Sequence, residues 1–323
     1  MTHPEKHYRF AVLADIHIDL ENGGKNIYFI HAEKNFSCAL QVIKERGCDF
    51  IISVGDQVTN ATGATEEWRR YRAIIDRSGY QGKFFEAMGN HELRFAKYGG
   101  CTVEECQDEF ILFTQLEQKP IIREENKTYY AYLDDNFGDA YLFLALEYSS
   151  DTPLTDNFSA EQMDWAERIL ERYTKEKCRV FLIQHVPFHA YGAGDDNEAP
   201  AYGGNMFLND EDGRPFDGNR RFYELIHRYK DVIWLSGHTH IDLRDEVNYS
   251  TAYGKACHML HIPGLAGSTR ITTINGKRGL DRTFYGEAAQ GYIADVYEDK
   301  VIFSGIDFLT NRLYPKYTYT IKR

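Results

Sequence analysis

The sequence predicts an α/β fold with a parallel sheet, and three observations lead to this prediction. Short apolar runs of strand length alternate with longer segments in which apolar residues recur at helical spacing. This alternation is typical of parallel strands joined by crossover helices. Hydrophobic residues make up 43% of the 323 residues, enough to bury a large core. Five apolar runs also end abruptly at polar side chains, which predicts ligand binding at the edge of the sheet.

The first third of the chain gives a β-α-β-α-β pattern. In chain order, the predicted elements are a strand at 10–14, a helix at 31–46, a strand at 50–54, a helix at 66–77 and a strand at 83–88. The first helix has an apolar stripe and ends before Gly47, and the second ends before Gly79. The three strands are mostly apolar, as expected for strands buried on both faces.

The remaining chain continues the pattern less regularly, and residues 92–128 show no clear period. The predicted elements that follow are a hairpin of 129–133 and 140–146, a helix to about 177, a strand at 179–183, a helix at 219–231, a strand at 232–235 and antiparallel strands at 291–297, 300–307 and 316–321. Ser159 and Gln162 form a capping box that opens the helix. Without an internal repeat or a clear linker, we expect one domain spanning 1–323.

Composition and charge exclude several classes of protein. Lysine and arginine number 37 against 49 aspartates and glutamates, giving a net charge of −12. No dense basic cluster offsets this charge, so we expect no nucleic-acid polymer as a partner. No apolar run approaches the ~18 residues of a membrane helix, so we expect no membrane association. A polar N-terminus without an apolar leader predicts a cytoplasmic location, and six scattered cysteines predict reduced thiols.

The polar residues that follow five predicted strands have the chemistry of metal ligands. They are Asp15 and His17, Asp56, Asn90 and His91, His185, and His238 and His240. With His91 set aside, seven oxygen and nitrogen ligands remain. One bridging carboxylate would let these seven supply eight bonds, four to each of two metals. Oxygen and nitrogen ligands without thiolate suit Mn, Fe, Zn, Co or Ni rather than Ca or Mg alone.

Each of these motifs has a simpler interpretation when taken alone. Gly-Asp after a strand is a common turn, and His185 has the sequence context of a satisfied buried histidine. The sequence Gly237-His238-Thr239-His240 is more specific, because two imidazoles flanking one residue in a loop rarely serve packing. All five motifs in this order, each after an apolar run, favour a metal site.

The ordered set of motifs resembles that of the calcineurin-like metallophosphoesterase superfamily, over about residues 9–240. The resemblance implies a four-layer α/β/β/α sandwich with two central mixed sheets, the second completed by strands within 291–323. It also implies a dinuclear centre of two divalent or trivalent ions, with Mn, Fe or Zn as candidates. One ion would bind Asp15, His17, Asp56 and His240, and the other Asp56, Asn90, His185 and His238. By the same resemblance, Asp56 bridges the ions and His91 faces substrate.

The implied chemistry is phosphoester hydrolysis by a metal-bound hydroxide. Two metals roughly 3.5–4 Å apart hold an in-line displacement and lower the pKa of bound water to about 7. Protonated His91 would stabilise phosphoryl charge or protonate the leaving oxygen. Gly89 would let the chain turn off its strand, whereas Glu92 has no evident role beyond orienting its neighbours.

Two departures narrow the subfamily that the sequence resembles. Thr59 stands where purple acid phosphatases have a tyrosine ligand, which argues against charge-transfer iron chemistry. Residues 59–61 stand where Ser/Thr protein phosphatases have Asp-Arg-Gly, so an arginine that could clamp phosphate is missing from that place. This argues against a protein phosphatase, and the sequence does not indicate which group orients His91.

The substrate is the least determined feature. We expect a small phosphodiester, such as a cyclic nucleotide or a glycerol- or sugar-linked diester. The alternatives are a phosphomonoesterase acting on a nucleotide or sugar phosphate, and a non-catalytic binding scaffold. Segments 186–220 and 241–290 follow ligand-bearing strands and are expected to be loops that wall the pocket. Candidate substrate contacts in them are His189, Tyr191, Tyr202, Phe207 and Arg270.

Overall fold

A computed structural model describes most of the chain. The described residues are 7–20, 29–59, 64–97, 100–147, 157–188, 195–196, 199–200, 206–210, 212–244, 248–251, 254–274, 277–285 and 288–323. Of these, only the backbone is described for 195–196, 199–200, 271–274 and 277–285. None of the helices in the described ranges is both long and apolar enough to cross a membrane.

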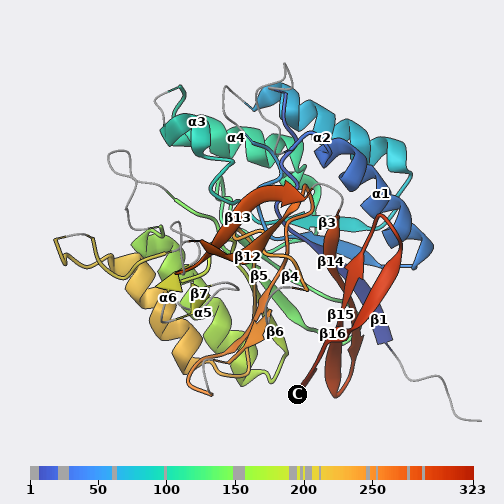
Figure 1. Cartoon of the computed structure of the whole chain (residues 1–323). Helices are drawn as coiled ribbons and strands as arrows, with labels where there is room; N and C mark the ends of the chain where they lie inside the picture. The colour runs from blue at the N-terminus through green and yellow to red at the C-terminus, as the bar shows by residue number, and fades with distance from the viewer. Residues whose placement is uncertain are drawn as a thin grey trace, which may run out of the picture.

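Two six-stranded mixed sheets form the centre of the molecule (Figure 1). The first has the order β16-β15-β14-β1-β2-β3, with β1 (His7–Leu13), β2 (Phe50–Ser53), β3 (Lys83–Glu86), β14 (Gln290–Tyr297), β15 (Lys300–Asp307) and β16 (Arg312–Lys322). The second has the order β10-β11-β9-β6-β5-β4, with β4 (Tyr130–Leu133), β5 (Ala140–Phe143), β6 (Val180–Ile183), β9 (Ile233–Ser236), β10 (Tyr249–Ser250) and β11 (His258–His261). The expected α/β fold with two mixed sheets is confirmed.

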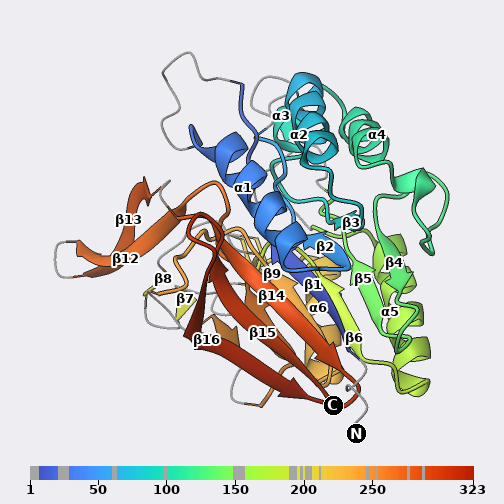
Figure 2. The same ribbon diagram turned by 90° about the vertical axis from the view of Figure 1, so that its right-hand side faces the viewer.

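Helices cover the outer faces of the two sheets (Figures 1 and 2). On the first sheet lie α1 (Ala32–Glu45) and α2 (Thr65–Ser78), and on the second lie α5 (Ala160–Lys175) and α6 (Asp217–Arg228). Both predicted crossover helices of the first sheet are present within one residue of their expected ends. The N-cap Ser159 accepts a hydrogen bond from the backbone N–H of Gln162, as its capping motif predicts.

The region that sequence patterns did not resolve, 92–128, is mainly short helices. It contains α3 (Arg94–Lys97), α4 (Val103–Phe113) and the 3₁₀ turn η1 (Leu116–Gln118). A full capping box of Thr102 and Glu105 opens α4. The flanking Cys101 and Cys106 occupy the positions of a hydrophobic staple, with their Sγ atoms 3.2 Å apart as free thiols.

The C-terminal strands do not complete the second sheet, so that expectation is wrong. They extend the first sheet, because β14 pairs antiparallel with the outer edge of β1 over six residue pairs, from His7 with Tyr297 to Val12 with Tyr292. An apolar strand pattern shows that a strand is buried but not which of two sheets it joins. Pairing with β14 also explains why β1 begins at His7, three residues before the predicted start.

The segment 241–290 is also different from the expected loop. It contains β10, β11 and the ribbon of β12 (Ser268–Ile274) and β13 (Lys277–Tyr285), while β7 (Asp195–Asp196) and β8 (Ala199–Pro200) form a second small ribbon. Strand β11 runs parallel to β9 inside the second sheet. Its four residues are two apolar residues between two histidines, too few and without alternation, so they give no strand pattern.

Aromatic side chains fill the space between the two sheets. The ring of Phe10 on β1 meets Tyr141 on β5 and Phe181 on β6 edge-on, at 5.6 and 5.7 Å between centroids. Below them the hydroxyls of Tyr8 and Tyr141 lie 2.6 Å apart, and Tyr8 donates to Asp139. This contact joins the two sheets across the sandwich. The carboxyl ends of the parallel strands of both sheets meet at one edge.

Candidate metal centre

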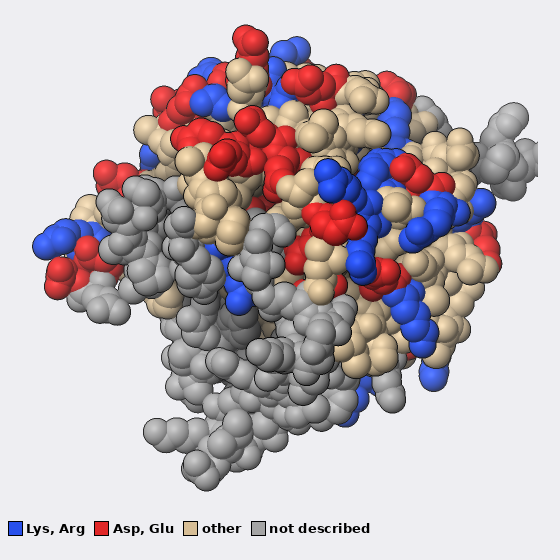
Figure 3. Space-filling model, turned by 90° about the horizontal axis from the view of Figure 1, so that it is seen from above, with Lys and Arg blue, Asp and Glu red and all other residues tan. Residues whose placement is uncertain are grey.

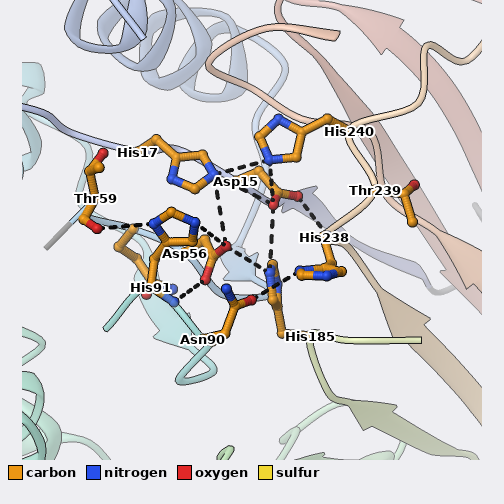
Figure 4. A network of polar contacts seen from close by, with 12 residues as sticks. Asp15, His17, Asp56, Thr59, Asn90, His91, His185, His238, Thr239 and His240 are labelled. Carbon is orange, nitrogen blue, oxygen red and sulfur yellow. Dashed lines mark hydrogen bonds and ion pairs between the residues drawn. The ribbon is translucent and has the colours of Figure 1, made fainter. Parts of the chain in front are cut away.

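The seven predicted ligands and His91 converge at that shared edge (Figure 4). Asp15 and His17 follow β1, Asp56 follows β2, Asn90 and His91 follow β3, His185 follows β6, and His238 and His240 follow β9. Two sheets therefore supply one cluster, although its members span residues 15–240. Convergence of strand ends was the central structural expectation from the sequence, and the structure shows it.

One group of ligands consists of Asp15, His17 and His240. The Nε2 atom of His240 lies 3.0 Å from Asp15 Oδ1, and His17 Nε2 lies 3.7 Å from the same oxygen. The two Nε2 atoms are themselves 3.0 Å apart. Ring nitrogens this close must share a proton or a cation, because two lone pairs facing each other repel.

The second group consists of Asp56, His185 and His238, with Asn90 beside them. His185 Nε2 lies 3.0 Å from Asp56 Oδ2. His238 faces its neighbour in this group with Nδ1 and not with Nε2, since its Nδ1 lies 3.0 Å from Asn90 Oδ1. In each of the two groups, the potential ligand atoms of the histidines and carboxylates lie within 4.8 Å of one another.

Asp56 lies between the two groups. Its Oδ2 atom is 3.0 Å from His185 Nε2 of the second group and 3.8 Å from His17 Nε2 of the first. A carboxylate in this position can bind both ions of a dinuclear site. The placement agrees with the bridging role that the resemblance implied.

Backbone carbonyls set the ring orientation of two ligand histidines. The Nδ1 atom of His185 lies 3.2 Å from the carbonyl oxygen of Val54, and that of His240 lies 3.3 Å from the oxygen of Gly267. Carbonyls only accept hydrogen bonds, so each Nδ1 carries a proton, and each Nε2 is left to present its lone pair to a bound cation. Such outer contacts commonly fix the tautomer of metal-binding histidines.

Two buried atoms without a well-formed hydrogen bond show that these residues fit a metal ion. They are Asp15 Oδ1 and His185 Nε2, which lie 3.6 Å apart, and each has only an ion-pair contact at 3.0 Å, to His240 and Asp56 respectively. Buried polar atoms are rarely left unsatisfied, since each costs about 1–3 kcal/mol. Both atoms are good ligands for the transition metals named above, so a cation at the centre would satisfy them.

The charges in the buried centre favour a cation. Burial alone would raise the pKa of Asp15, but the His240 and His185 rings hold it well below its usual value. Burial opposes ionisation of Asp56 too, yet the His185 ring keeps its pKa low. Burial tends to lower the pKa of His185, whereas the Asp56 and Asp15 carboxylates raise it to about 9. Burial lowers the pKa of His238 to about 3, so that ring is neutral at pH 7.

The backbone is strained at the ligands themselves. Five of them have left-handed φ angles, namely Asp15 (54°), His17 (49°), Asp56 (56°), His238 (74°) and His240 (56°). Residues other than glycine rarely adopt this backbone conformation, and each instance costs on the order of 1–3 kcal/mol. These positions must be held by surrounding contacts, and such strain concentrates at functional sites.

Glu92 supplies one set of those contacts, and the sequence had indicated no role for it beyond orienting its neighbours. Its buried carboxylate accepts hydrogen bonds from the backbone N–H groups of Gln57 (2.6 Å), Gly89 (2.7 Å) and Asp56 (3.1 Å). It thereby ties the turn after β2 to the turn after β3. Gly89 is needed for this approach rather than for a left-handed turn, because a Cβ there would lie 2.3 Å from Asp56 Oδ1.

Burial raises the pKa of Glu92 to about 8, so above that pH, where the carboxylate is ionised, replacing it with glutamine should lower the free energy of unfolding by about 1–3 kcal/mol. The new amide NH₂ faces backbone N–H groups, and at least one of them loses its acceptor. Urea unfolding of the metal-free protein measures the change. Glu104→Gln on the exposed side of α4 is the control. Equal stability of the two variants would contradict the role assigned to Glu92.

The backbone carbonyl of Thr59 orients His91. His91 Nδ1 lies 3.0 Å from that oxygen, and His91 Nε2 lies 3.9 Å from Asp56 Oδ2. Burial lowers the pKa of His91 to about 3, so the ring is neutral here and its Nε2 presents a lone pair. Its side chain remains 19% exposed, unlike the fully buried His17, over which Phe29 stacks at 4.2 Å.

The predicted substrate contacts are only partly placed. His189, Tyr191 and Tyr202 lie outside the described residues. Phe207 is half-buried, and its carbonyl accepts a hydrogen bond from Asn219. Arg270 is half-buried on β12, which reaches the centre because the N–H of the preceding Thr269 donates to the carbonyl of His240.

Comparisons with known proteins agree with this geometry. The family model described as calcineurin-like phosphoesterase matches residues 8–242, well over half of the chain. The fold is similar to that of a dimetal phosphatase from Danio rerio, with a TM-score of 0.60, 12% sequence identity and 98% of each chain covered. It is also similar to purple acid phosphatase PPD1 from yellow lupin (Lupinus luteus), with a TM-score of 0.60 and 16% identity. That alignment covers 99% of this chain and 54% of the lupin chain.

No curated protein matches the sequence. At identities this low, the two structural likenesses show a shared fold alone. The family match adds the chemistry, because it spans all five ligand motifs, from Asp15 to His240. The chain belongs to the calcineurin-like phosphoesterase family, and it is a metallophosphoesterase.

Proposed function

We propose that the protein is a metal-dependent phosphodiesterase that acts on a small organic or cyclic-nucleotide phosphodiester. The observation that carries this proposal is the pair of buried ligand groups with Asp56 placed to contact both, and with His91 beside them. The Danio rerio neighbour is itself described as a dimetal phosphatase. An oxygen and nitrogen ligand set of this kind supports two ions of Mn, Fe or Zn.

Each residue has a definite part in the proposed site. Asp15, His17 and His240 would hold one ion, and Asn90, His185 and His238 the other, with Asp56 shared. When bound, the two ions polarise phosphoryl oxygens and lower the pKa of a water nucleophile. In the described part of the chain, the ion pairs of Asp15 and Asp56 are all with histidines.

His91 would act on the phosphoryl group rather than on a metal. Its ring is neutral at neutral pH, and its free Nε2 points toward the centre from a partly exposed position (Figure 4). A phosphate anion next to Nε2 favours protonation of the ring, because an adjacent negative charge stabilises the imidazolium. The protonated ring would then donate to a phosphoryl or leaving oxygen, a contribution of roughly 10²–10⁴-fold.

The charge pattern supports a diester of small size. Within the described residues, the ion pairs of Asp15 and Asp56 are with histidines and none is with lysine or arginine. A diester carries one negative charge and needs less compensation than a monoester dianion. Over α1 and α2, basic and acidic side chains intermingle (Figure 3), and pairs such as Arg70 with Glu33 neutralise each other. That face offers no broad basic surface for a nucleic-acid polymer.

Hydrolysis of model esters tests the proposal. With Mn²⁺ added, bis(p-nitrophenyl) phosphate should be hydrolysed with a higher kcat/KM than p-nitrophenyl phosphate. A strong preference for the monoester would replace the diesterase by a phosphomonoesterase acting on a nucleotide or sugar phosphate. A panel of cyclic nucleotides and of glycerol- and sugar-linked diesters then identifies the substrate class.

A further inference from the structure

We propose that Asn248, His261 and Thr239 form a buried hydrogen-bonded chain that positions the two metal-binding histidines His238 and His240. The inference rests on the proposed function, because it takes these two histidines as metal ligands. Thr239 lies between them in the turn after β9, apart from the ring of ligand side chains (Figure 4). Neither Asn248 nor His261 contributes to the two ligand groups.

The chain of contacts is short and closed to solvent. Thr239 Oγ1 lies 2.6 Å from His261 Nε2, and His261 Nδ1 lies 3.2 Å from Asn248 Oδ1. Thr239 is fully buried, and the other two residues are 3% exposed. A second contact strengthens the far end, where the backbone N–H of His261 donates to the Asn248 carbonyl at 2.8 Å.

The hydrogen bonds have one consistent direction. The side-chain amide of Asn248 donates through Nδ2 to the carbonyl of Leu243, so its Oδ1 faces His261 as an acceptor. His261 must then carry its proton on Nδ1 and present the lone pair of Nε2. The Thr239 hydroxyl therefore donates to His261, and the three side chains are satisfied in series.

His261 is a rigid anchor for this chain. It is the last residue of β11, paired with Ser236 at the end of β9, and so lies directly beside the turn. The backbone N–H of the next residue, Ile262, donates to Ser236 at 2.6 Å. A side chain fixed in the sheet can hold a loop in place more accurately than another loop could.

The turn needs such an anchor because its backbone is strained on both sides of Thr239. His238 and His240 have φ angles of 74° and 56°, in the left-handed region. Every polar group of Thr239 is held: its N–H donates to the Gly237 carbonyl, and its own carbonyl accepts from the Thr269 hydroxyl. With the side chain held by His261, Thr239 fixes where both ligand rings point.

A simpler interpretation is that Thr239 and His261 only fill space in the core. Valine has the shape of threonine without the hydroxyl, so it separates the two interpretations. Thr239→Val should weaken metal binding about 10–100-fold, the usual effect of losing a contact behind a metal ligand. Thr239→Ser keeps the hydroxyl and should bind metal within about threefold of the wild type.

Variants of His261 provide a second, independent pair. The side-chain amide of His261→Gln can reach the position of Nε2 and accept from Thr239. His261→Asn is shorter, so it keeps a partner in Asn248 but loses Thr239. Metal affinity should therefore be largely retained in His261→Gln and reduced about 10–100-fold in His261→Asn. His258→Asn is the matched control, because His258 lies on the same strand and pairs instead with Tyr249 at 2.7 Å.

Titration of the metal-free proteins with Mn²⁺ by calorimetry, with no substrate present, tests the proposal. Thermal melting of each metal-free variant identifies any that fails to fold. If Thr239→Val fails to fold, the two His261 variants provide the test instead. Wild-type affinity in Thr239→Val and His261→Asn would overturn the positioning role and leave the proposed function intact. Equal weakening in all four variants would reduce the role to packing and also overturn it. A wild type that binds no Mn²⁺, Zn²⁺ or Co²⁺ would overturn the proposed function together with this inference.

Discussion

Asp56→Asn is expected to abolish binding of at least one metal ion and to reduce turnover on the order of 10³-fold, equivalent to about 4 kcal/mol. Asp56 Oδ2 faces His185 of one ligand group at 3.0 Å and His17 of the other at 3.8 Å. An asparagine offers one ligand oxygen and no charge, so it cannot serve two cations. Elemental analysis of the purified variant and its kcat on a phosphodiester measure both effects.

The control variant removes an exposed carboxylate instead of a buried one. Asp76 is 60% exposed on α2, pairs with Arg72 and belongs to neither ligand group. Asp76→Asn should keep wild-type metal content and turnover, since exposed ion pairs contribute about 0–1 kcal/mol. Full metal occupancy in Asp56→Asn would show that this carboxylate does not bridge the centre.

His91→Ala is expected to keep both metals and to lose roughly 10²–10⁴-fold in kcat. The side chain of His91 is held by the Thr59 carbonyl and is partly exposed, whereas the ligand rings are buried. One potential ligand atom of His91 also lies within 4.8 Å of those of His17 and Asp56, so metal content separates a catalytic role from a ligand role. Metal analysis and kcat on the same preparation distinguish the two.

Loss of a metal in His91→Ala would contradict the assigned role and make His91 a ligand. His227→Ala serves as the matched control. His227 lies on α6, where its Nδ1 contacts the Tyr223 carbonyl one turn earlier. This variant should retain both metals and full turnover, because His227 belongs to neither ligand group.

The positions of the ligands were predictable because they follow a rule of topology. Parallel strands place their carboxyl ends at one edge, so Asp15 and Asp56 had to be neighbours once β1 and β2 were recognised. Bringing His185 and His238 to the same place required the second sheet to face the first. That arrangement came from the family resemblance and not from the local pattern.

The supporting contacts were not predictable from patterns, because they depend on side-chain direction. From the sequence Glu92 had no evident role beyond orienting its neighbours, yet it is 1% exposed and accepts hydrogen bonds from several backbone N–H groups. His261 lies in a segment expected to be a loop, where β11 is too short to show a period. The prediction that the strands within 291–323 join the second sheet was wrong for a related reason, since strand pairing across 280 residues leaves no local signal in the sequence.

The most direct test of a dinuclear phosphoesterase centre is the metal content of the purified protein, measured together with its activity. The protein, as purified or after reconstitution with Mn²⁺ or Zn²⁺, should hold two ions per chain and hydrolyse a phosphodiester, and a chelator should remove both properties. Protein that binds no metal, and that neither Mn²⁺ nor Zn²⁺ activates, would contradict the account.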